Sequence, residues 1–360
     1  MTIIYLYRSL AAFGGVERIF IDKANYLAEH YGYHVYIITW EQGGHSIVYP
    51  LSPKVTHIDW GILFYRQYQY GLFKRMFMQW KMEKEFFKKL SNFVHTTQAD
   101  IVIGASCEFT TMAGMDLLQR KTHTILETHS MRTSIEKNNP PAGNLLMRWA
   151  FKRRDKKLHQ YIKHMSAFVT LTHNDAKDWS DITPQARIIP NMLHRYPAEI
   201  SPDKKTQKRI ITAGRLVEQK GYDLLLDAWS KVHQKHPEWI LDIYGEGEDK
   251  NMLLEKRKNL ALENSVLFHP PTPDIYQKYM DSDFYVMSSR YEGFGLVLAE
   301  AMSCGIPCVS FDCPHGPSDI IKDHEDGLLV EKENIKELAD KICYLIENEN
   351  VRIKMGHKAR

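Results

Sequence analysis

The sequence predicts an α/β protein made of two doubly wound domains, each a parallel sheet covered by helices on both faces. Short apolar runs alternate with amphipathic stretches along almost the whole chain, a pattern typical of strand–helix–strand units with right-handed crossovers. The alternation begins anew near residue 209, after an irregular stretch that contains three prolines. The length agrees, because 360 residues at about 150 per domain indicate two domains.

The first domain is expected over residues 1–195. Its predicted strands are apolar runs of three to six residues. Its clearest predicted helices are the amphipathic stretches between these runs. The strands cover residues 2–7, 34–39, 55–58, 101–103, 123–126 and 167–171, and the helices cover 16–30 and 109–119. The proline-containing stretch, residues 189–203, is the predicted linker.

The second domain is expected over residues 196–345. The predicted strands cover residues 209–213, 240–244, 266–268, 284–287, 307–310 and 327–330. The predicted helices cover 223–234, 250–260, 296–303 and 335–347. Residues 346–360 are expected to begin a C-terminal helix, either complete or truncated. In such sheets ligands bind beyond the carboxyl ends of the strands, so we expect the site in a cleft between the domains.

The composition excludes several classes of protein. With 44% hydrophobic and 25% charged residues the chain is not intrinsically disordered. No apolar run approaches the ~18 residues of a membrane span, and the N-terminus lacks the features of a signal peptide. The five cysteines form no CxxC pairs, so we interpret them as reduced thiols rather than zinc ligands. We expect a cytoplasmic protein, either free or peripheral on the inner face of the cytoplasmic membrane.

The net charge of +3 conceals an asymmetry between the two halves. Residues 1–195 carry 25 Lys and Arg against 16 Asp and Glu, whereas residues 196–360 carry 22 against 28. The positive excess is concentrated in residues 73–90 and 149–157, both predicted to be helical. Basic amphipathic helices are typical of membrane-surface elements, which favours docking on an anionic membrane, although solvated helix faces would have the same composition. No recognition motif accompanies the charge, so a nucleic-acid partner is not expected.

Two glycine-containing loops are candidates for binding an anion. Gly14 and Gly15 follow the first strand and open the first helix, where free N–H groups face a ligand, although an ordinary strand-to-helix turn has the same sequence. Gly214 follows the first strand of the second domain, and Arg215 and Lys220 in the same loop would neutralise a diphosphate. Taken alone, that loop would more often be a loop of solvated charges.

Two further stretches carry polar groups at strand ends. Glu292 lies in a glycine-rich loop, followed by the helix-opening residues Phe294, Gly295 and Leu296. Glu300 sits among apolar neighbours and therefore needs a hydrogen-bond partner, which a ligand hydroxyl would supply. His129 follows a first-domain strand, where a cleft-facing role and a structural role are both open.

In combination these motifs resemble the GT-B retaining glycosyltransferases of family 4. The resemblance rests on Gly-Gly-Val-Glu-Arg at 14–18, Gly-Arg-Leu at 214–216 with Glu-Gln-Lys-Gly at 218–221, Ile-Tyr-Gly-Glu-Gly at 243–247, and the Glu-x7-Glu pair of Glu292 and Glu300. It covers nearly the whole chain and is most specific from Gly214 to Glu300. It implies two Rossmann-like domains that face a central cleft.

The resemblance also implies a role for each candidate residue. Arg215 and Lys220 would bind the donor diphosphate, Glu292 would hold the donor sugar, and His129 would lie beside that sugar. Donor contacts are further implied for Gly14, Gly15, Gly214, Phe268, His269, Phe294, Gly295, Leu296 and Glu300, with the base near Phe268 and His269.

The implied activity is transfer of a hexose, with retention, from a nucleotide diphosphate sugar to a saccharide or a lipid-linked (polyprenyl) saccharide in polysaccharide or glycolipid biosynthesis. The resemblance favours a UDP-sugar, with no cofactor and no metal. The alternatives are a nucleotide-sugar epimerase or hydrolase on the same fold, and a non-catalytic nucleotide-sugar-binding module.

Two motifs are interpreted as coincidental, and two loops depart from the family pattern. Asp281 and Asp283 fit a metal-binding Asp-x-Asp pattern but precede an ordinary strand, and Gly245-Glu-Gly247 lacks the third glycine of a dinucleotide fingerprint. Residues 314–319 replace a double-glycine loop, and His269 is followed by two prolines where a glycine is common.

Overall fold

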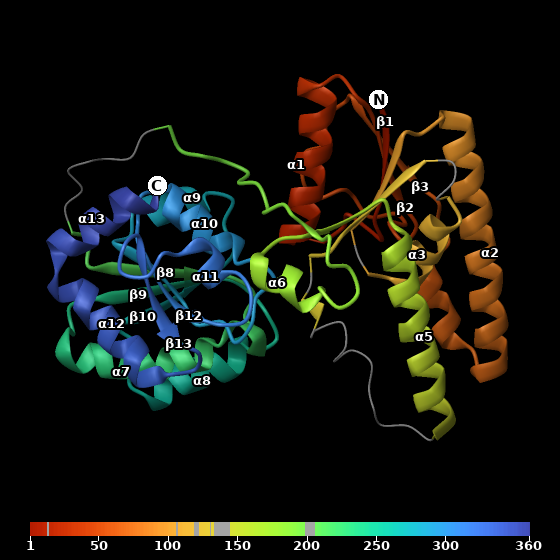
Figure 1. Ribbon diagram of the computed structural model, residues 1–360. Helices are drawn as coiled ribbons and strands as arrows, with labels where there is room; N and C mark the ends of the chain where they lie inside the picture. The colour runs from red at the N-terminus through yellow and green to blue at the C-terminus, as the bar shows by residue number, and fades with distance from the viewer. Residues whose placement is uncertain (13, 106, 119–121, 130, 133–144, 199–205) are drawn as a thin grey trace. The chain divides into compact units, whose positions relative to one another are not determined.

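Two parallel sheets organise the chain, and each belongs to its own unit (Figure 1). The computed structural model describes all residues except 13, 106, 119–121, 130, 133–144 and 199–205, and for residues 145–151 it describes only the backbone. The units are Met1–His194 and Arg195–Arg360, so the boundary falls within the predicted linker. The expected α/β class with two doubly wound, Rossmann-like domains is confirmed.

The sheet of unit 1 has the strand order β3-β2-β1-β4-β5-β6-β7, with every neighbouring pair parallel. The order reverses between β1 and β4, which is where doubly wound sheets bind ligands at the carboxyl ends of their strands. The strands are β1 (Thr2–Leu6), β2 (His34–Thr39), β3 (Val55–Asp59), β4 (Ile101–Gly104), β5 (His123–Glu127), β6 (Ala167–Thr170) and β7 (Arg187–Ile188).

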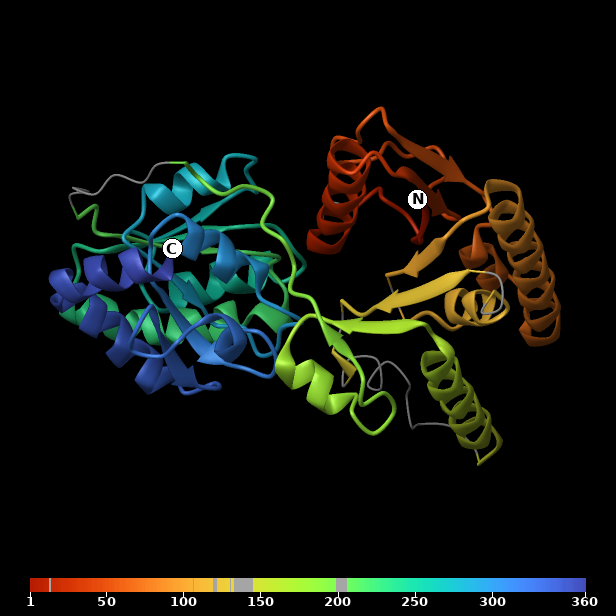
Figure 2. The same ribbon diagram turned by 45° about the horizontal axis from the view of Figure 1, so that its top comes forward.

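Helices cover both faces of this sheet, as the two views in Figures 1 and 2 show. Helix α1 (Gly15–His30) lies on one face, and α2 (Leu72–Thr97), α3 (Phe109–Asp116) and α5 (Leu145–His164) lie on the other. The alternation along β1 explains the two layers, because Ile3 and Tyr5 join the core under α1 while Ile4 and Leu6 join the core under α2 and α3. The 3-10 helix η1 (Phe64–Gln69) precedes α2, and α6 (His173–Asp178) follows β6.

The sheet of unit 2 has the order β10-β9-β8-β11-β12-β13 and is also parallel. Its strands are β8 (Arg209–Ala213), β9 (Ile240–Tyr244), β10 (Val266–His269), β11 (Phe284–Met287), β12 (Cys308–Asp312) and β13 (Gly327–Glu331). One face is covered by α7 (Tyr222–Lys235), α8 (Lys250–Asn259) and α12 (Ile335–Glu347), and the other by α9 (Ile275–Met280) and α10 (Leu296–Ser303). The remaining elements are η2 (Glu218–Lys220), α11 (Pro317–Ile320) and α13 (Glu349–Ala359).

The predicted strands are all present, and their ends are shifted by no more than two residues. The first-domain helix predicted over 109–119 ends earlier, at Asp116, and residue 119 lies outside the described part. Strand β7 and the helices α6, α9 and α11 were missed because each has at most six residues, too few to show a period. The C-terminal residues form two helices, since α12 ends at Glu347 and α13 begins at Glu349. Of the helices described, none is both long and apolar enough to cross a bilayer.

A buried carboxylate fastens the entry of the chain into the second sheet. Asp283, directly before β11, accepts backbone N–H groups of Gln207 and Arg209 at 3.0 Å each. Its other oxygen lies 3.9 Å from Nη2 of Arg352 in α13. The side chains of Asp283 and Arg352 are both about 95% buried, and Arg352 is compensated by Asp283 together with Glu349, whose Oε1 lies 3.7 Å from the same nitrogen.

Replacing Asp283 by Ala should therefore lower the free energy of unfolding by about 2–4 kcal/mol, because two backbone donors lose their acceptor and a buried guanidinium loses a nearby negative charge. Urea unfolding followed by circular dichroism measures the change. The matched control is Asp281→Ala, at the exposed position two residues earlier, which should shift stability by less than about 0.5 kcal/mol. Equal effects of the two substitutions would contradict this role for Asp283.

Candidate functional site

In unit 2, the loops after β8 and β11 meet at the carboxyl edge of the sheet. Gly221 has φ 62°, and a Cβ there would lie 2.1 Å from the carbonyl oxygen of Ser288, so only glycine fits. The Ser288 hydroxyl donates to the carbonyl of Lys220 at 3.0 Å, and the backbone N–H of Arg290 donates to the carbonyl of Gln219 at 2.8 Å. These contacts fix the positions of both loops.

The fixed loops bring two of the predicted catalytic residues together. Lys220 Nζ lies 2.7 Å from Glu292 Oε1, and the Ser289 hydroxyl donates to the same oxygen at 2.6 Å. The Glu292 side chain is buried, and such an ion pair is tolerated only where hydrogen bonds satisfy its remaining lone pairs. The ammonium group has three donors, so Lys220 retains donors for a ligand.

Cys313, at the end of β12, lies beside this ion pair. Burial, with a smaller contribution from the Glu292 carboxylate, raises the pKa of its thiol to about 12. The thiol is therefore neutral at physiological pH. In the part of the chain that the structure describes, all five cysteines are free thiols.

Arg215 differs from Lys220 because it is exposed. Within the described residues its guanidinium makes no hydrogen bond and no ion pair, although it is in the same loop. Gly214, the preceding residue, lies next to the side chain of Lys220: a Cβ there would be 3.4 Å from Lys220 Cε. The loop thus presents one cation tied to a carboxylate and one cation open to solvent.

The start of α10 carries the predicted backbone donors. Gly295 is the N-cap residue with φ 87° and supplies no side-chain cap, so the first N–H groups, beginning with Leu296, are left for other acceptors. Phe294 is buried, and its carbonyl is so close to Gly316 that a Cβ at Gly316 would lie 2.0 Å from it. Residues 314–319, the loop that departs from the family pattern, therefore pack against this turn. The Pro314 carbonyl accepts the N–H of Glu292 at 3.4 Å.

Glu300 has a partner within the protein. The Tyr279 hydroxyl of α9 donates to Glu300 Oε2 at 3.4 Å, and both side chains are buried. Burial, followed by the Glu300 carboxylate, raises the pKa of Tyr279, which remains a donor. The expected need for a partner is met in part by tyrosine, a residue that sequence reasoning did not connect with Glu300.

Phe268 and His269 lie at the end of β10, and their side chains have different surroundings. Phe268 packs toward the core under α7 and α8, with the Arg257 guanidinium 5.7 Å from its ring centroid. His269 Nε2 lies 2.7 Å from Asp242 Oδ1, and its ring stacks on Tyr244 at 4.5 Å. Asp242 also accepts two hydrogen bonds from Arg209, at 2.6 and 2.8 Å.

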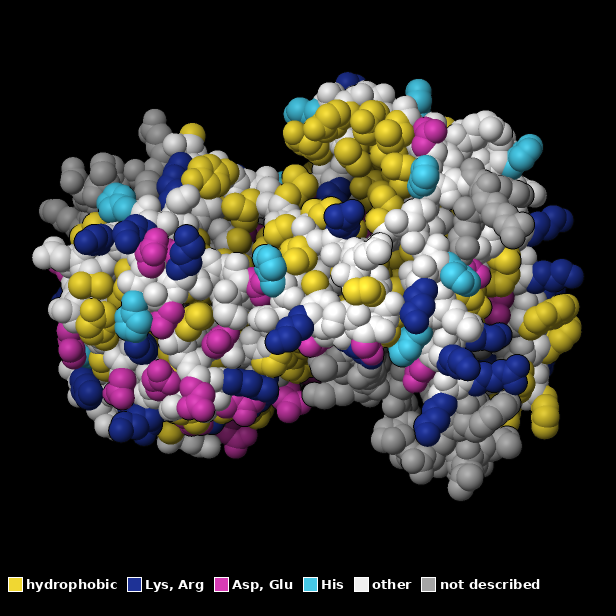
Figure 3. All heavy atoms as spheres, viewed as in Figure 1, with side chains coloured by type: hydrophobic (Ala, Val, Ile, Leu, Met, Phe, Trp, Pro, Cys, Tyr) yellow, Lys and Arg dark blue, Asp and Glu magenta, His cyan; other side chains and the backbone are white. Residues whose placement is uncertain are grey.

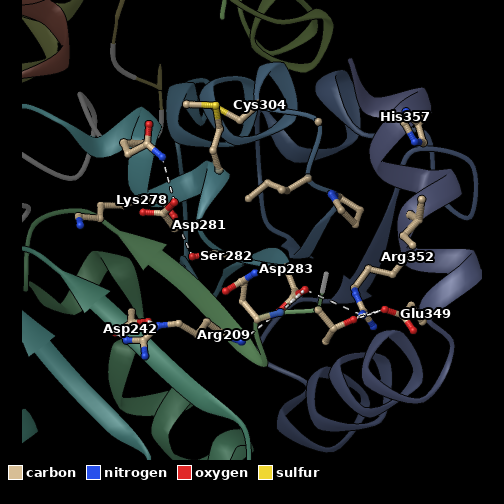
Figure 4. Close-up of a pocket in the computed structure, with 18 of the residues that line it drawn as sticks. Arg209, Asp242, Lys278, Asp281, Ser282, Asp283, Cys304, Glu349, Arg352 and His357 are labelled. Carbon is tan, nitrogen blue, oxygen red and sulfur yellow. Dashed lines mark hydrogen bonds and ion pairs between the residues drawn. The ribbon is translucent and has the colours of Figure 1, made fainter. Parts of the chain in front are cut away.

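Unit 2 also contains a polar pocket of about 610 Å³, at the amino ends of β8, β11 and β12 (Figure 4). Asp281 and Asp283 line it, at the opposite edge of the sheet from the loops that hold Lys220 and Glu292. The oxygens of Asp283 are used by backbone N–H groups, as described above. Among the described residues, no cluster of three His, Cys, Asp or Glu side chains is arranged to hold a metal ion.

In unit 1, His129 follows β5 and is linked to helix α1 through a carboxylate. His129 Nε2 lies 3.4 Å from Glu127 Oε2, which also accepts from Lys23 Nζ at 2.9 Å. Burial raises the pKa of Glu127, but its contacts with His129 and Lys23 outweigh burial and hold that pKa below its usual value. Glu127 was not predicted as a site residue. Gly15 begins α1 and Gly14 is its extended N-cap residue; Phe13 and Ser130, which flank these motifs, lie outside the described residues.

Unit 1 also contains a pocket that sequence reasoning missed, with a volume of about 460 Å³. It lies at the carboxyl ends of β1, β2 and β4, beneath η1 and the first half of α2. Three carboxylates line it, together with two cations and several aromatic rings: Glu41, Glu83, Glu108, Arg8, Arg154, Phe64, Tyr65, Tyr68 and Phe109. Burial raises the pKa of Glu108, partly offset by Arg8. Carboxylates beside aromatic rings match the hydroxyls and apolar faces of a saccharide.

The chain is similar in sequence to known glycosyltransferases. Residues 198–360 match the model of the family described as glycosyl transferases group 1. An uncharacterized glycosyltransferase of Haemophilus influenzae is 29% identical over 366 residues, which cover 99% of this chain and 93% of that protein. The amylovoran biosynthesis glycosyltransferase AmsD of Erwinia amylovora is 40% identical over 169 residues, covering 47% of this chain and 46% of that protein.

The likeness in structure extends over the whole chain. A mutant of S. aureus TarM, solved in complex with fondaparinux, α-GlcNAc-glycerol and UDP, superposes with a TM-score of 0.75 at 17% identity and covers 99% of this chain and 95% of that chain. At this identity the likeness concerns the fold. This chain therefore has the GT-B fold, and its residues 198–360 match the model of the glycosyl transferases group 1 family.

Proposed function

We propose that this protein is a retaining hexosyltransferase of family 4 that moves a sugar from a UDP-sugar to a saccharide or lipid-linked saccharide in polysaccharide or glycolipid biosynthesis. The observation that carries the proposal is the buried Lys220–Glu292 ion pair, 2.7 Å long, in the same loops as Arg215, a cation without a partner among the described residues. The UDP of the TarM complex and the amylovoran biosynthesis named for the Erwinia relative support the donor and acceptor classes.

The chemistry follows from the charges. When the bond between the sugar C1 and the diphosphate oxygen breaks, negative charge grows on the diphosphate and positive charge on the sugar. The negative charge on the diphosphate would be stabilised by Arg215, Lys220 and the N–H groups at the start of α10. Glu292 would hold hydroxyls of the sugar. The acceptor oxygen then bonds to C1 on the same face, and its proton passes to the leaving phosphate. His129 would lie beside the sugar, and no metal is needed.

Glu292→Gln should lower kcat by about 10²–10³-fold while the protein remains folded, because the amide keeps the shape but loses the charge that Lys220 and the sugar hydroxyls recognise. Transfer is measured by release of UDP, and folding by circular dichroism. The control is Glu218→Gln, at an exposed position in the neighbouring loop, which should leave the rate unchanged. A Glu292→Gln enzyme with the wild-type rate would refute the role of Glu292.

Arg215→Ala should weaken binding of the donor without changing the melting temperature of the free protein, because Arg215 is exposed and has no partner among the described residues. UDP at 100 times its Kd should stabilise the wild type by about 2.7 kcal/mol, and most of this gain should be lost in the variant. Thermal shifts with UDP, GDP and ADP are the measurement, with Lys231→Ala as the exposed control on α7.

The same experiments test the proposed charge neutralisation. If Arg215 and Lys220 neutralise the diphosphate, transfer by the wild type continues at its full rate in EDTA. A strict requirement for a divalent cation would contradict this part of the proposal, and a larger shift with GDP than with UDP would contradict the assigned base.

The pocket of unit 1 is proposed to bind the acceptor saccharide. Glu108→Gln should then lower kcat/KM for the acceptor by about 10–100-fold, the value of a hydrogen bond to a charged group, and leave the KM for the donor unchanged. Initial rates at varied acceptor and varied donor concentrations separate the two effects. Glu29→Gln, exposed on α1, is the control, and a change confined to the donor KM would contradict the assignment.

A further inference from the structure

Helix α2 carries two apolar stripes, and the fold covers only one of them. Met82, Phe86 and Leu90 are buried in the core against the sheet and α3. In the first half of the helix, Phe73, Met76, Phe77 and Trp80 recur at the spacing i, i+3, i+4, i+7 and therefore share a second face. All four are exposed, from 56% at Trp80 to 86% at Phe73.

The exposed stripe continues onto the preceding 3-10 helix. Leu72 is 69% exposed, and Tyr65 and Tyr68 of η1 are 50% and 65% exposed. Figure 3 shows hydrophobic side chains beside Lys and Arg side chains over this part of α2. We define the η1–α2 face as Tyr65, Tyr68, Leu72, Phe73, Met76, Phe77 and Trp80. A contiguous apolar face of this kind marks an interaction site rather than ordinary surface.

The segment that carries the η1–α2 face is cationic, whereas the carboxylates of Glu41 and Glu83 line the adjoining pocket. Residues 60–82 contain Arg66, Lys74, Arg75 and Lys81 and no Asp or Glu. Several of the cations of this segment and the next turn lie over aromatic rings: Lys74 over Tyr70 at 4.2 Å, Arg75 over Tyr68 at 4.2 Å, and Lys84 over Trp80 at 5.3 Å. Aromatic rings with long cationic side chains beside them suit the boundary between headgroups and acyl chains.

We propose that the η1–α2 face binds the surface of an anionic membrane, with its aromatic and apolar side chains inserted among the headgroups. Charge decides between this occupant and a second copy of the chain. An isologous dimer would bring the four cations of residues 60–82 close to their copies, whereas an anionic bilayer complements all four. The proposal narrows the predicted membrane-binding stretch, residues 73–90, to its first half, because the second half packs in the core.

The pocket of unit 1 adjoins the same face. Tyr65 and Tyr68 both line that pocket and belong to the η1–α2 face. A membrane bound at this face would therefore lie next to the proposed acceptor pocket. Docking itself does not depend on the proposed transferase activity, so the two can be tested separately.

The experiment is flotation of the full chain with vesicles of phosphatidylcholine alone or with phosphatidylglycerol. The wild type should float with the anionic vesicles and lose binding as salt is raised. The triple variant Phe73→Ser, Phe77→Ser, Trp80→Ser should bind at least tenfold more weakly. The triple variant Arg66→Gln, Lys74→Gln, Lys81→Gln should lose roughly 100-fold, since each cation contributes about fivefold.

The matched control is Met252→Ser with Ile353→Ser, two apolar side chains exposed on unit 2, which should float like the wild type. Circular dichroism and the thermal shift with UDP check that each variant is folded and binds donor, independently of the membrane. Equal recovery with neutral and anionic vesicles, or wild-type flotation of both triple variants, would overturn the proposal. So would a dimer in sedimentation velocity that the Phe73, Phe77, Trp80 variant abolishes, because a second copy would then cover the face.

Discussion

In unit 2, the backbone of Gly221 lies so close to the carbonyl of Ser288 that no side chain fits between them. That contact depends on the strand order, because β8 and β11 are neighbours although more than 70 residues separate them in sequence. The contact between Gly221 and Ser288 fixes the positions of the two loops relative to the sheet. It therefore brings Lys220 next to Glu292. The ion pair, Ser289 and the thiol of Cys313 are all arranged around this approach of two backbones.

Much of this arrangement can be predicted from local sequence. Parallel strands place their carboxyl ends at one edge, so loops that follow strands are sound candidates for a site. Lys220 and Glu292 were predicted in this way, since each belongs to a glycine-containing loop directly after an apolar run, and the structure brings the two side chains together. The predicted strands were also accurate, because continuous apolar runs bounded by polar turns have few alternative structures.

Partners that come from distant strands could not be predicted. Asp242 contacts both Arg209 and His269, yet the three residues lie on three strands whose register no local pattern gives. Tyr279 reaches Glu300 from a helix too short to be recognised. The unit 1 pocket collects side chains from several separate segments, none of which carries a motif of its own. Amphipathic spacing in α2 likewise reveals two stripes but not which of them the sheet covers.

The length of α2 has a mechanical consequence. Its 26 residues form one uninterrupted helix about 39 Å long. The second half is clamped in the core by Phe86 and Leu90, while the first half is held only along one side. Because the helix is continuous and stiff, a displacement of its first residues moves the following turns as well. A force applied at Phe73 is therefore transmitted to the residues that frame the unit 1 pocket, Gln79 and Glu83, instead of being absorbed by a flexible loop.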